Sequence, residues 1–256
     1  MRIGVSGAAG RMGRTVCAAV ASDPELVLVA AVDPSGVGET IDGLEVSGSL
    51  DAFAGARCDA VVDFTVADAA RATVPWLAEH GIHAVVGTTG FTDADLESFE
   101  SAFGAAAAPN CLVAPNFAIS AVLMMRFAEM AAPFFDTAEI VELHHDRKVD
   151  APSGTAVKTA ERMAHARDGA FADDPTTDEV YAGARGGDGP SGIRIHSVRM
   201  RGMVAHQEVI LGAQGQTLTI RQDSYDRDSF MPGVLLACKK IAQVPGLTRS
   251  LDRFLD

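Results

Sequence analysis

Two adjacent histidines and a lysine stand in one short segment, and their side chains can carry protons. The segment spans residues 144–155 and reads HHDRKVDAPSGT. Imidazole titrates near neutral pH, and a lysine removed from water can exchange a proton in the same range. His144 and Lys148 are therefore the candidate catalytic residues, and one positioned proton donor contributes about 10² to 10⁴ in rate. Adjacent residues of a strand point to opposite faces, so His144 and His145 are poorly placed to share a metal ion, and no metal site is predicted.

The end of this segment, Ser153-Gly154-Thr155, opens a predicted helix and could bind an anion. Backbone amides at a helix start and the Thr155 hydroxyl can hold a carboxylate against the positive end of the helix dipole. The alternative is an ordinary helix cap formed by Ser153 or Thr155. Lys148 is one of only four lysines among 21 basic residues in a chain of net charge -13, so positive charge in this loop is not compositional background. A small anionic substrate is the natural inference.

A glycine-rich turn near the start of the chain is the candidate nucleotide site. Residues 7–13 read GAAGRMG and lie between a predicted strand and a predicted helix. Glycines there permit a tight turn and let backbone amides approach a pyrophosphate. The spacing is G-x-x-G-x-x-G, and such a turn can also be a plain strand-to-helix connection. Asp33 strengthens the nucleotide interpretation, because it ends the next strand, where a carboxylate accepts hydrogen bonds from an adenosine ribose.

Asp33 also bears on the choice of nucleotide. It is followed by Pro34, so no arginine stands there to pair with a 2′-phosphate, which the acid itself would repel. NADH is therefore favoured over NADPH, with dual use left open through Arg11 and Arg14. Two further segments, residues 87–90 and 114–117, follow predicted strands at the edge where open α/β sheets bind ligands, although both could be simple loops.

The elements that must position these residues fall into two groups. Short apolar strands alternate with helices over the first 115 residues, which predicts a Rossmann-like, doubly wound parallel sheet of the α/β class. After Pro115 the pattern changes: a helix over about residues 119–135, a strand at 138–143 and a helix over about 155–167 are expected. Three strand-like runs then follow in succession, at 193–199, 204–212 and 217–222, which predicts a second α+β domain built on an open mixed sheet. We expect residues 1–115 plus 226–256 to form the dinucleotide-binding domain. Residues 116–225 are expected to form a substrate-binding and oligomerisation domain.

Composition excludes several classes of protein. The negative net charge and the absence of a basic run argue against nucleic-acid binding. No apolar run reaches the roughly 18 to 20 residues of a membrane span, and a strand pattern begins at Ile3, which leaves no room for a signal peptide. Four scattered cysteines fit reduced core thiols. These features predict a cytoplasmic protein without a membrane partner.

Taken together, the motifs resemble the dihydrodipicolinate reductase family, also called 4-hydroxy-tetrahydrodipicolinate reductase. The pattern HHxxKxDAPSGTA at residues 144–156 is similar to the family's signature. Further similar segments occur in the same order along the chain: residues 7–13, 63–65, 87–91, 114–117, 196–199 and 206–208.

The resemblance implies an enzyme of lysine biosynthesis through diaminopimelate. It would reduce (2S,4S)-4-hydroxy-2,3,4,5-tetrahydrodipicolinate to (S)-2,3,4,5-tetrahydrodipicolinate and water with NADH or NADPH, and it would form a homotetramer. His144 would be a proton donor or acceptor, Lys148 a proton donor, and His145, Gly154 and Thr155 would hold the dicarboxylate. The family's cofactor contacts correspond to Gly7, Ala8, Ala9, Gly10, Arg11, Met12, Asp33, Gly87, Thr88, Thr89, Ala114, Pro115, Asn116 and Phe117. Some members carry arginine where Pro34 stands, which puts dual cofactor use in doubt.

Two other functions remain as alternatives. A regulator that senses NAD(H) without turnover would need a DNA-binding or partner-binding module, which this acidic chain does not offer. A dehydrogenase acting through a cysteine thioester would need a thiol facing the nicotinamide, whereas Cys111 lies inside a predicted strand.

Overall fold

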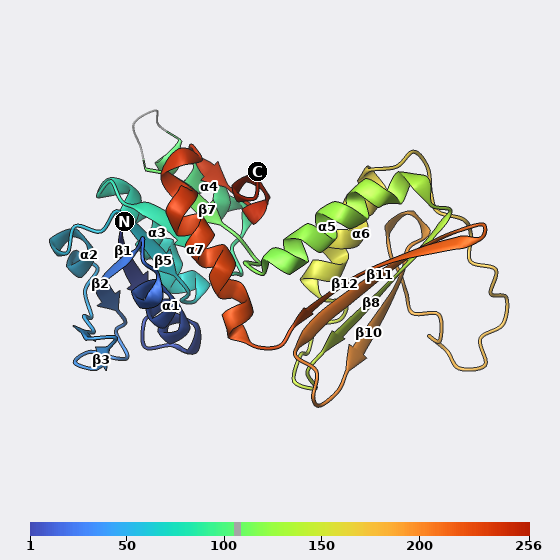
Figure 1. Ribbon diagram of the computed structural model, residues 1–256, viewed down its shortest axis with the longest axis horizontal. Coiled ribbons are helices and arrows are strands. Elements are labelled where there is room, and N and C mark those ends of the chain that lie inside the picture. The colour runs from blue at the N-terminus through green and yellow to red at the C-terminus, as the bar shows by residue number, and fades with distance from the viewer. Residues whose placement is uncertain (105–108) are drawn as a thin grey trace. The chain divides into compact units, whose positions relative to one another are not determined.

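The computed structural model describes residues 1–104 and 109–256, which form two compact units (Figure 1). Unit 1 comprises Met1–Ile119 together with Arg227–Asp256, and unit 2 comprises Ser120–Asp226. The expected division lay at residues 115/116 and 225/226. The role assigned to each part stays a prediction.

Unit 1 is built on a six-stranded sheet in the order β13-β7-β6-β5-β1-β2, in which every pair of neighbours is parallel. Its strands are β1 (Arg2–Ser6), β2 (Val27–Val32), β5 (Ala60–Asp63), β6 (His83–Val86), β7 (Cys111–Val113) and β13 (Leu247–Thr248). Continuous apolar runs suit a sheet that is covered on both faces, and all four residues of β5 are buried. The predicted Rossmann-like sheet is confirmed.

Helices separate these strands, as the alternating pattern predicts. They are α1 (Arg11–Ser22), α2 (Asp51–Gly55), α3 (Ala67–Glu79), α4 (Asp93–Phe103) and α7 (Met231–Lys240), with a small ladder of β3 (Thr40–Ile41) and β4 (Leu44–Glu45). Thr92 and Asp95 form a capping box at the start of α4. The sequence pattern predicts this helix over about residues 93–107, and its predicted end, Ala107, lies outside the described residues. α7 packs against α1 within unit 1.

Unit 2 contains a five-stranded sheet in the order β12-β11-β8-β10-β9. Its strands are β8 (Thr137–His144), β9 (Gly187–Asp188), β10 (Arg194–Arg199), β11 (Ala205–Ala213) and β12 (Gln216–Ser224). β8 and β10 are parallel and the other pairs are antiparallel, so the predicted mixed sheet is confirmed.

The helices α5 (Ile119–Ala131) and α6 (Gly154–His165) lie along the same side of this sheet (Figure 1). Gln207 of β11 donates a hydrogen bond to Thr159 of α6 at 2.8 Å, which fixes the helix-covered face. α5 was expected to reach residue 135. It ends at Ala131 and continues as a short 3-10 turn, because Pro133 has no amide hydrogen for the helical ladder. None of the helices in residues 1–104 and 109–256 has the length and apolar character needed to cross a membrane.

Candidate active site

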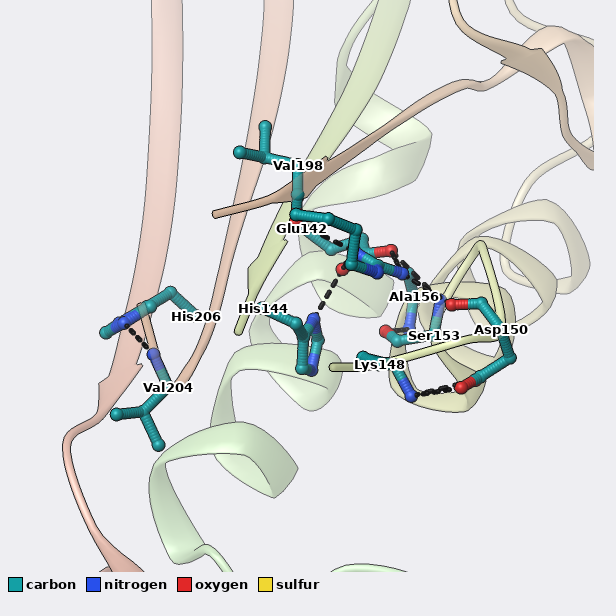
Figure 2. Close-up of polar contacts among 10 residues, drawn as sticks. Glu142, His144, Lys148, Asp150, Ser153, Ala156, Val198, Val204 and His206 are labelled. Atoms are coloured by element: carbon teal, nitrogen blue, oxygen red, sulfur yellow. Dashed lines mark hydrogen bonds and ion pairs between the residues drawn. The ribbon is translucent and has the colours of Figure 1, made fainter. Parts of the chain in front are cut away.

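The two predicted proton carriers lie in unit 2, where strand β8 ends and the motif loop begins. His144 is the last residue of β8, and its Nδ1 atom lies 2.5 Å from the Oε2 atom of Glu142 (Figure 2). Residues two apart in a strand share a face, so this contact follows from the local geometry. Glu142 is completely buried, whereas His144 is half-buried at the strand end.

A guanidinium group neutralises the buried carboxylate. Arg199 of β10 donates from both terminal nitrogens to the two oxygens of Glu142, at 2.7 and 2.9 Å. Burial opposes ionisation of Glu142, but hydrogen bonds from Arg199, Ser197 and His144 outweigh it and lower the pKa of the carboxyl group. Glu142 is therefore an anion at neutral pH.

The ionisation of His144 is set mainly by its burial. Burial disfavours the imidazolium and lowers the pKa of His144 below its ordinary value, while Glu142 opposes this shift. His144 is consequently neutral at pH 7, and its Nδ1 hydrogen points to the Glu142 anion. The Nε2 atom has no hydrogen-bond partner among the described residues. A neutral imidazole of this tautomer can accept a proton at Nε2 and later return it.

Lys148 lies four residues further along the loop, and its ammonium group is held in place by Asp150. The Nζ atom donates to the two carboxylate oxygens at 2.8 and 2.9 Å, and these side chains lie together in Figure 2. This pair lowers the pKa of Asp150. The Asp150 carbonyl in turn accepts a hydrogen bond from Arg199 at 2.6 Å, so the loop that carries Lys148 is tied to the same guanidinium as Glu142.

The predicted carboxylate-binding turn, Ser153-Gly154-Thr155, coincides with the start of α6. Ser153 is the N-cap, and its hydroxyl accepts a hydrogen bond from the Ala156 amide at 3.2 Å, as the ordinary capping interpretation expected. Gly154 is exposed, and a Cβ atom added to it would meet nothing within 4 Å. No acidic residue stands in the first turn of the helix. The Glu142 anion already accepts from the Ser153 amide there and its charge is balanced by Arg199, so a carboxylate can approach the exposed Gly154 end of the helix without steric opposition.

In unit 1, the glycine turn has the shape that a bound pyrophosphate needs. Gly7 has φ +77°, and a Cβ atom on Gly13 would lie 1.9 Å from the Gly7 carbonyl oxygen, so the turn and α1 are in close contact. The N-cap of α1 is Gly10, which offers no side chain to its first amides. These amides and the helix dipole form an anion site.

Asp33 lies next to this turn. Its carboxylate accepts hydrogen bonds from the amides of Ala9 at 3.1 Å and Ser35 at 2.9 Å. A hollow of about 550 Å³ opens beside it, between the loops that follow β1, β2 and β5. The residues present therefore fit an adenosine ribose and a pyrophosphate.

The remaining predicted contacts follow β6 and β7 on the same edge of the sheet. Thr89 and Pro115 line a second, smaller hollow there. The hydroxyl of Thr88 is engaged inside the protein, where it donates to the Asp63 carboxylate at 2.6 Å. The same carboxylate oxygen accepts from the hydroxyl of Thr65 at 2.9 Å, so a fully buried aspartate joins the loops after β5 and β6.

Sequence reasoning assigned no role to Glu142, Asp63 or Asp150, and it quoted Arg199 only as part of a family segment. A signal for Glu142 exists in retrospect. An acidic residue two positions before a histidine in a strand places a carboxylate on the face of that histidine. A charge buried there needs a cation, which the neighbouring strand supplies as Arg199.

Comparison with known proteins identifies the same family for both halves of the chain. Residues 1–117 match the family model described as dihydrodipicolinate reductase, N-terminus, and residues 120–255 match the model described as dihydrodipicolinate reductase, C-terminus. The first of these is a nucleotide-binding domain, which supports a pyridine nucleotide cofactor.

Individual relatives agree with the family models. A 4-hydroxy-tetrahydrodipicolinate reductase of Nocardia farcinica is 51% identical, over 100% of this chain and 99% of its own length. The 4-hydroxy-tetrahydrodipicolinate reductase of Mycobacterium marinum is 48% identical, over 100% of this chain and 99% of its own length. A solved structure, dipicolinate-bound dihydrodipicolinate reductase from Paenisporosarcina sp. TG-14, matches at a TM-score of 0.88 and 36% identity, covering 99% of this chain and 98% of that one.

A more distant structural neighbour, a myo-inositol dehydrogenase from Corynebacterium glutamicum, is 18% identical with a TM-score of 0.63 and shares the fold alone. The near relatives favour an enzyme over the NAD(H)-sensing alternative. The chain belongs to the dihydrodipicolinate reductase family and is an oxidoreductase that reduces 4-hydroxy-tetrahydrodipicolinate in the diaminopimelate route to lysine.

Proposed function

We propose that the loop between β8 and α6 binds the dicarboxylate substrate and exchanges its protons, while unit 1 binds the nucleotide, with NADH preferred. The observation that carries this proposal is that His144 and the start of α6 both contact one buried carboxylate, Glu142, to which Arg199 ties the Lys148 loop. Proton carriers and an anion-binding helix end are thus held by the same part of the fold.

Substrate binding is assigned to the first turn of α6. Gly154 and Thr155 would hold one carboxylate through backbone amides and the Thr155 hydroxyl, and His145 would add a further hydrogen bond. The His145 Nδ1 atom already accepts a hydrogen bond from the Arg147 amide at 3.2 Å, which leaves its Nε2 atom for the ligand. The dipicolinate-bound relative supports a planar dicarboxylate as the ligand class.

The reaction consumes one hydride and one proton and releases one water. NADH, held by the glycine turn and Asp33, would supply a hydride to the ring carbon that loses its hydroxyl group. We assign the departure of that hydroxyl as water to the Lys148 ammonium, which is the cation of the loop. The neutral imidazole of His144 can accept a ring proton at Nε2 during this elimination and return it to the enamine carbon after hydride transfer. The one proton consumed is that given by Lys148 to the departing water, and solvent restores it, so atoms and charge balance.

The preference for NADH rests on charge around the ribose pocket. Asp33 would repel a 2′-phosphate, and Pro34 supplies no cation. Of the two arginines on α1, Arg11 and Arg14, the second forms an ion pair with Glu39 and donates to the Ala9 carbonyl oxygen at 3.0 Å. A 2′-phosphate would have to compete with Glu39 for that guanidinium, so NADPH is the weaker cofactor in this proposal.

Assembly as a homotetramer through the sheet of unit 2 is also proposed. The helices α5 and α6 cover one face of this sheet, whereas Val141, Leu143 and Ile210 are half-buried side chains at positions of the opposite face. Such a face suits contact with further copies of the chain. Location in the cytoplasm stays a prediction.

Substrate binding is tested by titrating dipicolinate into the NADH-loaded protein by calorimetry. Thr155→Val removes one hydroxyl donor and is expected to weaken binding by about fivefold to tenfold, as loss of one hydrogen bond to a charged group does. Thr217→Val, an exposed threonine of β12, is the matched control and should leave the affinity unchanged. Equal affinities of the wild type and Thr155→Val would contradict the assignment of the Thr155 hydroxyl to the substrate site.

A further inference from the structure

Glu142 is a buried charged residue to which the proposed chemistry gives no direct step. It is 0% exposed, although it lies at the centre of the site. Its Oε1 atom accepts from Arg199 at 2.7 Å and from the Ser153 amide at 3.2 Å, while its Oε2 atom accepts from Arg199 at 2.9 Å and lies 2.5 Å from His144. A carboxylate has about four lone-pair positions, and these contacts, together with the hydrogen bond from Ser197, leave none of them free.

The partners of Glu142 come from separate parts of the site. His144 is the proton carrier, Ser153 begins the helix that would hold the substrate, and Arg199 also binds the carbonyl of Asp150 in the Lys148 loop. One carboxylate therefore contacts the proton carrier and the helix start directly, and it reaches the Lys148 loop through Arg199.

We propose that Glu142 is the positioning residue of this active site, which holds His144 in the Nδ1–H tautomer and sets the start of α6. The inference rests on the proposed roles of His144 and α6. An anionic oxygen beside Nδ1 accepts the hydrogen there, so the Nε2 lone pair remains available for the substrate. In a neutral histidine the orientation and tautomer are set by the partner of the second nitrogen, and Glu142 is that partner.

Arg199 completes this arrangement by balancing charge. An unpaired anion next to His144 would favour the imidazolium and would leave no free lone pair at Nε2. Arg199 and Lys148 both oppose the imidazolium, and with burial they keep the pKa of His144 low. The Glu142–Arg199 pair therefore orients His144 without protonating it.

The first test uses the wild-type protein, so folding of a variant does not enter. NMR of histidine labelled with nitrogen-15 distinguishes the two tautomers of a neutral imidazole. Loss of one signal in His144→Gln assigns His144. We expect the Nδ1–H form for His144 at neutral pH. An Nε2–H form, or rapid exchange between the two, would overturn the proposal whether or not the protein reduces the expected substrate.

The second test uses Glu142→Gln. The glutamine Oε1 atom can still accept from the Ser153 amide, but its NH₂ group would donate to Nδ1 and reverse the tautomer. We expect kcat to fall at least about tenfold while KM changes much less, because the helix start is retained. The pKa of His144 should fall further, since an anion that favours the imidazolium is lost. A kcat close to that of the wild type, or an unchanged tautomer, would contradict the proposal.

A matched control lies on the same strand. Glu139 also pairs with a histidine and an arginine, His196 at 2.8 Å and Arg185 at 2.7 Å, but it stands on the opposite face of β8. Glu139→Gln should therefore retain wild-type kcat and the Nδ1–H signal of His144. An equal loss of kcat in both variants would show a general effect of removing a paired carboxylate from β8.

Glu142→Gln leaves Arg199 without its anion, and a buried unpaired charge is costly. If this variant does not fold, Glu142→Gln combined with Arg199→Met removes both charges and keeps the side-chain volume. The proposal expects the folded double variant to lose the Nδ1–H signal and to keep the kcat defect. If the double variant also fails to fold, the tautomer of the wild type decides. An inactive wild type with His144 in the Nδ1–H form would refute the proposed function but not the role of Glu142.

Discussion

Lys148→Gln and His144→Gln each lower kcat by about 10² to 10⁴, the loss expected when a positioned proton donor or acceptor is removed. The affinity for NADH stays nearly unchanged, because both residues belong to unit 2 and the glycine turn belongs to unit 1. Glutamine keeps a polar side chain of similar reach in both places, so the loss reports proton transfer rather than packing. Steady-state kinetics and a fluorescence titration of NADH measure the two quantities.

The control for this pair is Lys158→Gln. Lys158 lies on α6, where its side chain is 64% exposed and pairs with Glu161. Its replacement removes one positive charge from unit 2 without touching the motif loop, so turnover should stay at the wild-type level. Wild-type turnover in Lys148→Gln or in His144→Gln would remove that residue from the mechanism.

Gly13→Ala is expected to disrupt the nucleotide site and to destabilise unit 1. The added Cβ atom would lie 1.9 Å from the Gly7 carbonyl oxygen and 2.8 Å from the Ala8 Cα atom. Both contacts are with backbone atoms, so α1 or the glycine turn must move. Such overpacking costs about 1 to 3 kcal/mol or more in the free energy of unfolding, and displaced amides should weaken NADH binding at least about tenfold. Chemical denaturation and the NADH titration measure these effects.

Gly55→Ala is the control for this change. Gly55 ends α2 in the same unit, and a Cβ atom built on it meets nothing within 4 Å. Its replacement should leave the NADH affinity unchanged and the stability the same or slightly higher. Normal stability and NADH binding in Gly13→Ala would mean that the close contact between α1 and the turn is not needed for the nucleotide site.

The parts of the fold that depend on local pattern were predictable. Continuous apolar runs such as Val27–Val32 predicted the parallel strands. After Pro115 the alternation of strands and helices gives way to successive strands, which predicted the second sheet. Elements of two residues were missed, because no periodicity exists at that length. β13 is the clearest case: Leu247 and Thr248 form a strand only by pairing with β7, a contact between residues far apart in the chain.

The candidate site likewise contains residues that local sequence pattern reveals and residues that only long-range contacts bring together. His144, Lys148 and the Ser153–Thr155 turn carry their chemistry in consecutive residues, so their types and spacing indicated it. Glu142 and Arg199 do not, because their contact depends on the register in which β8 pairs with β10. An anion in a strand is recognisable, but which cation reaches it is a property of the folded sheet.

The most direct test of the account is the reduction itself. The substrate is generated in place from pyruvate and aspartate semialdehyde by its synthase, the wild-type protein is added, and the oxidation of NADH or NADPH is followed by absorbance. We expect oxidation that depends on both precursors and on the synthase, with a higher kcat/KM for NADH than for NADPH. No oxidation of either nucleotide would contradict the account, and a higher kcat/KM for NADPH would contradict the role given to Asp33.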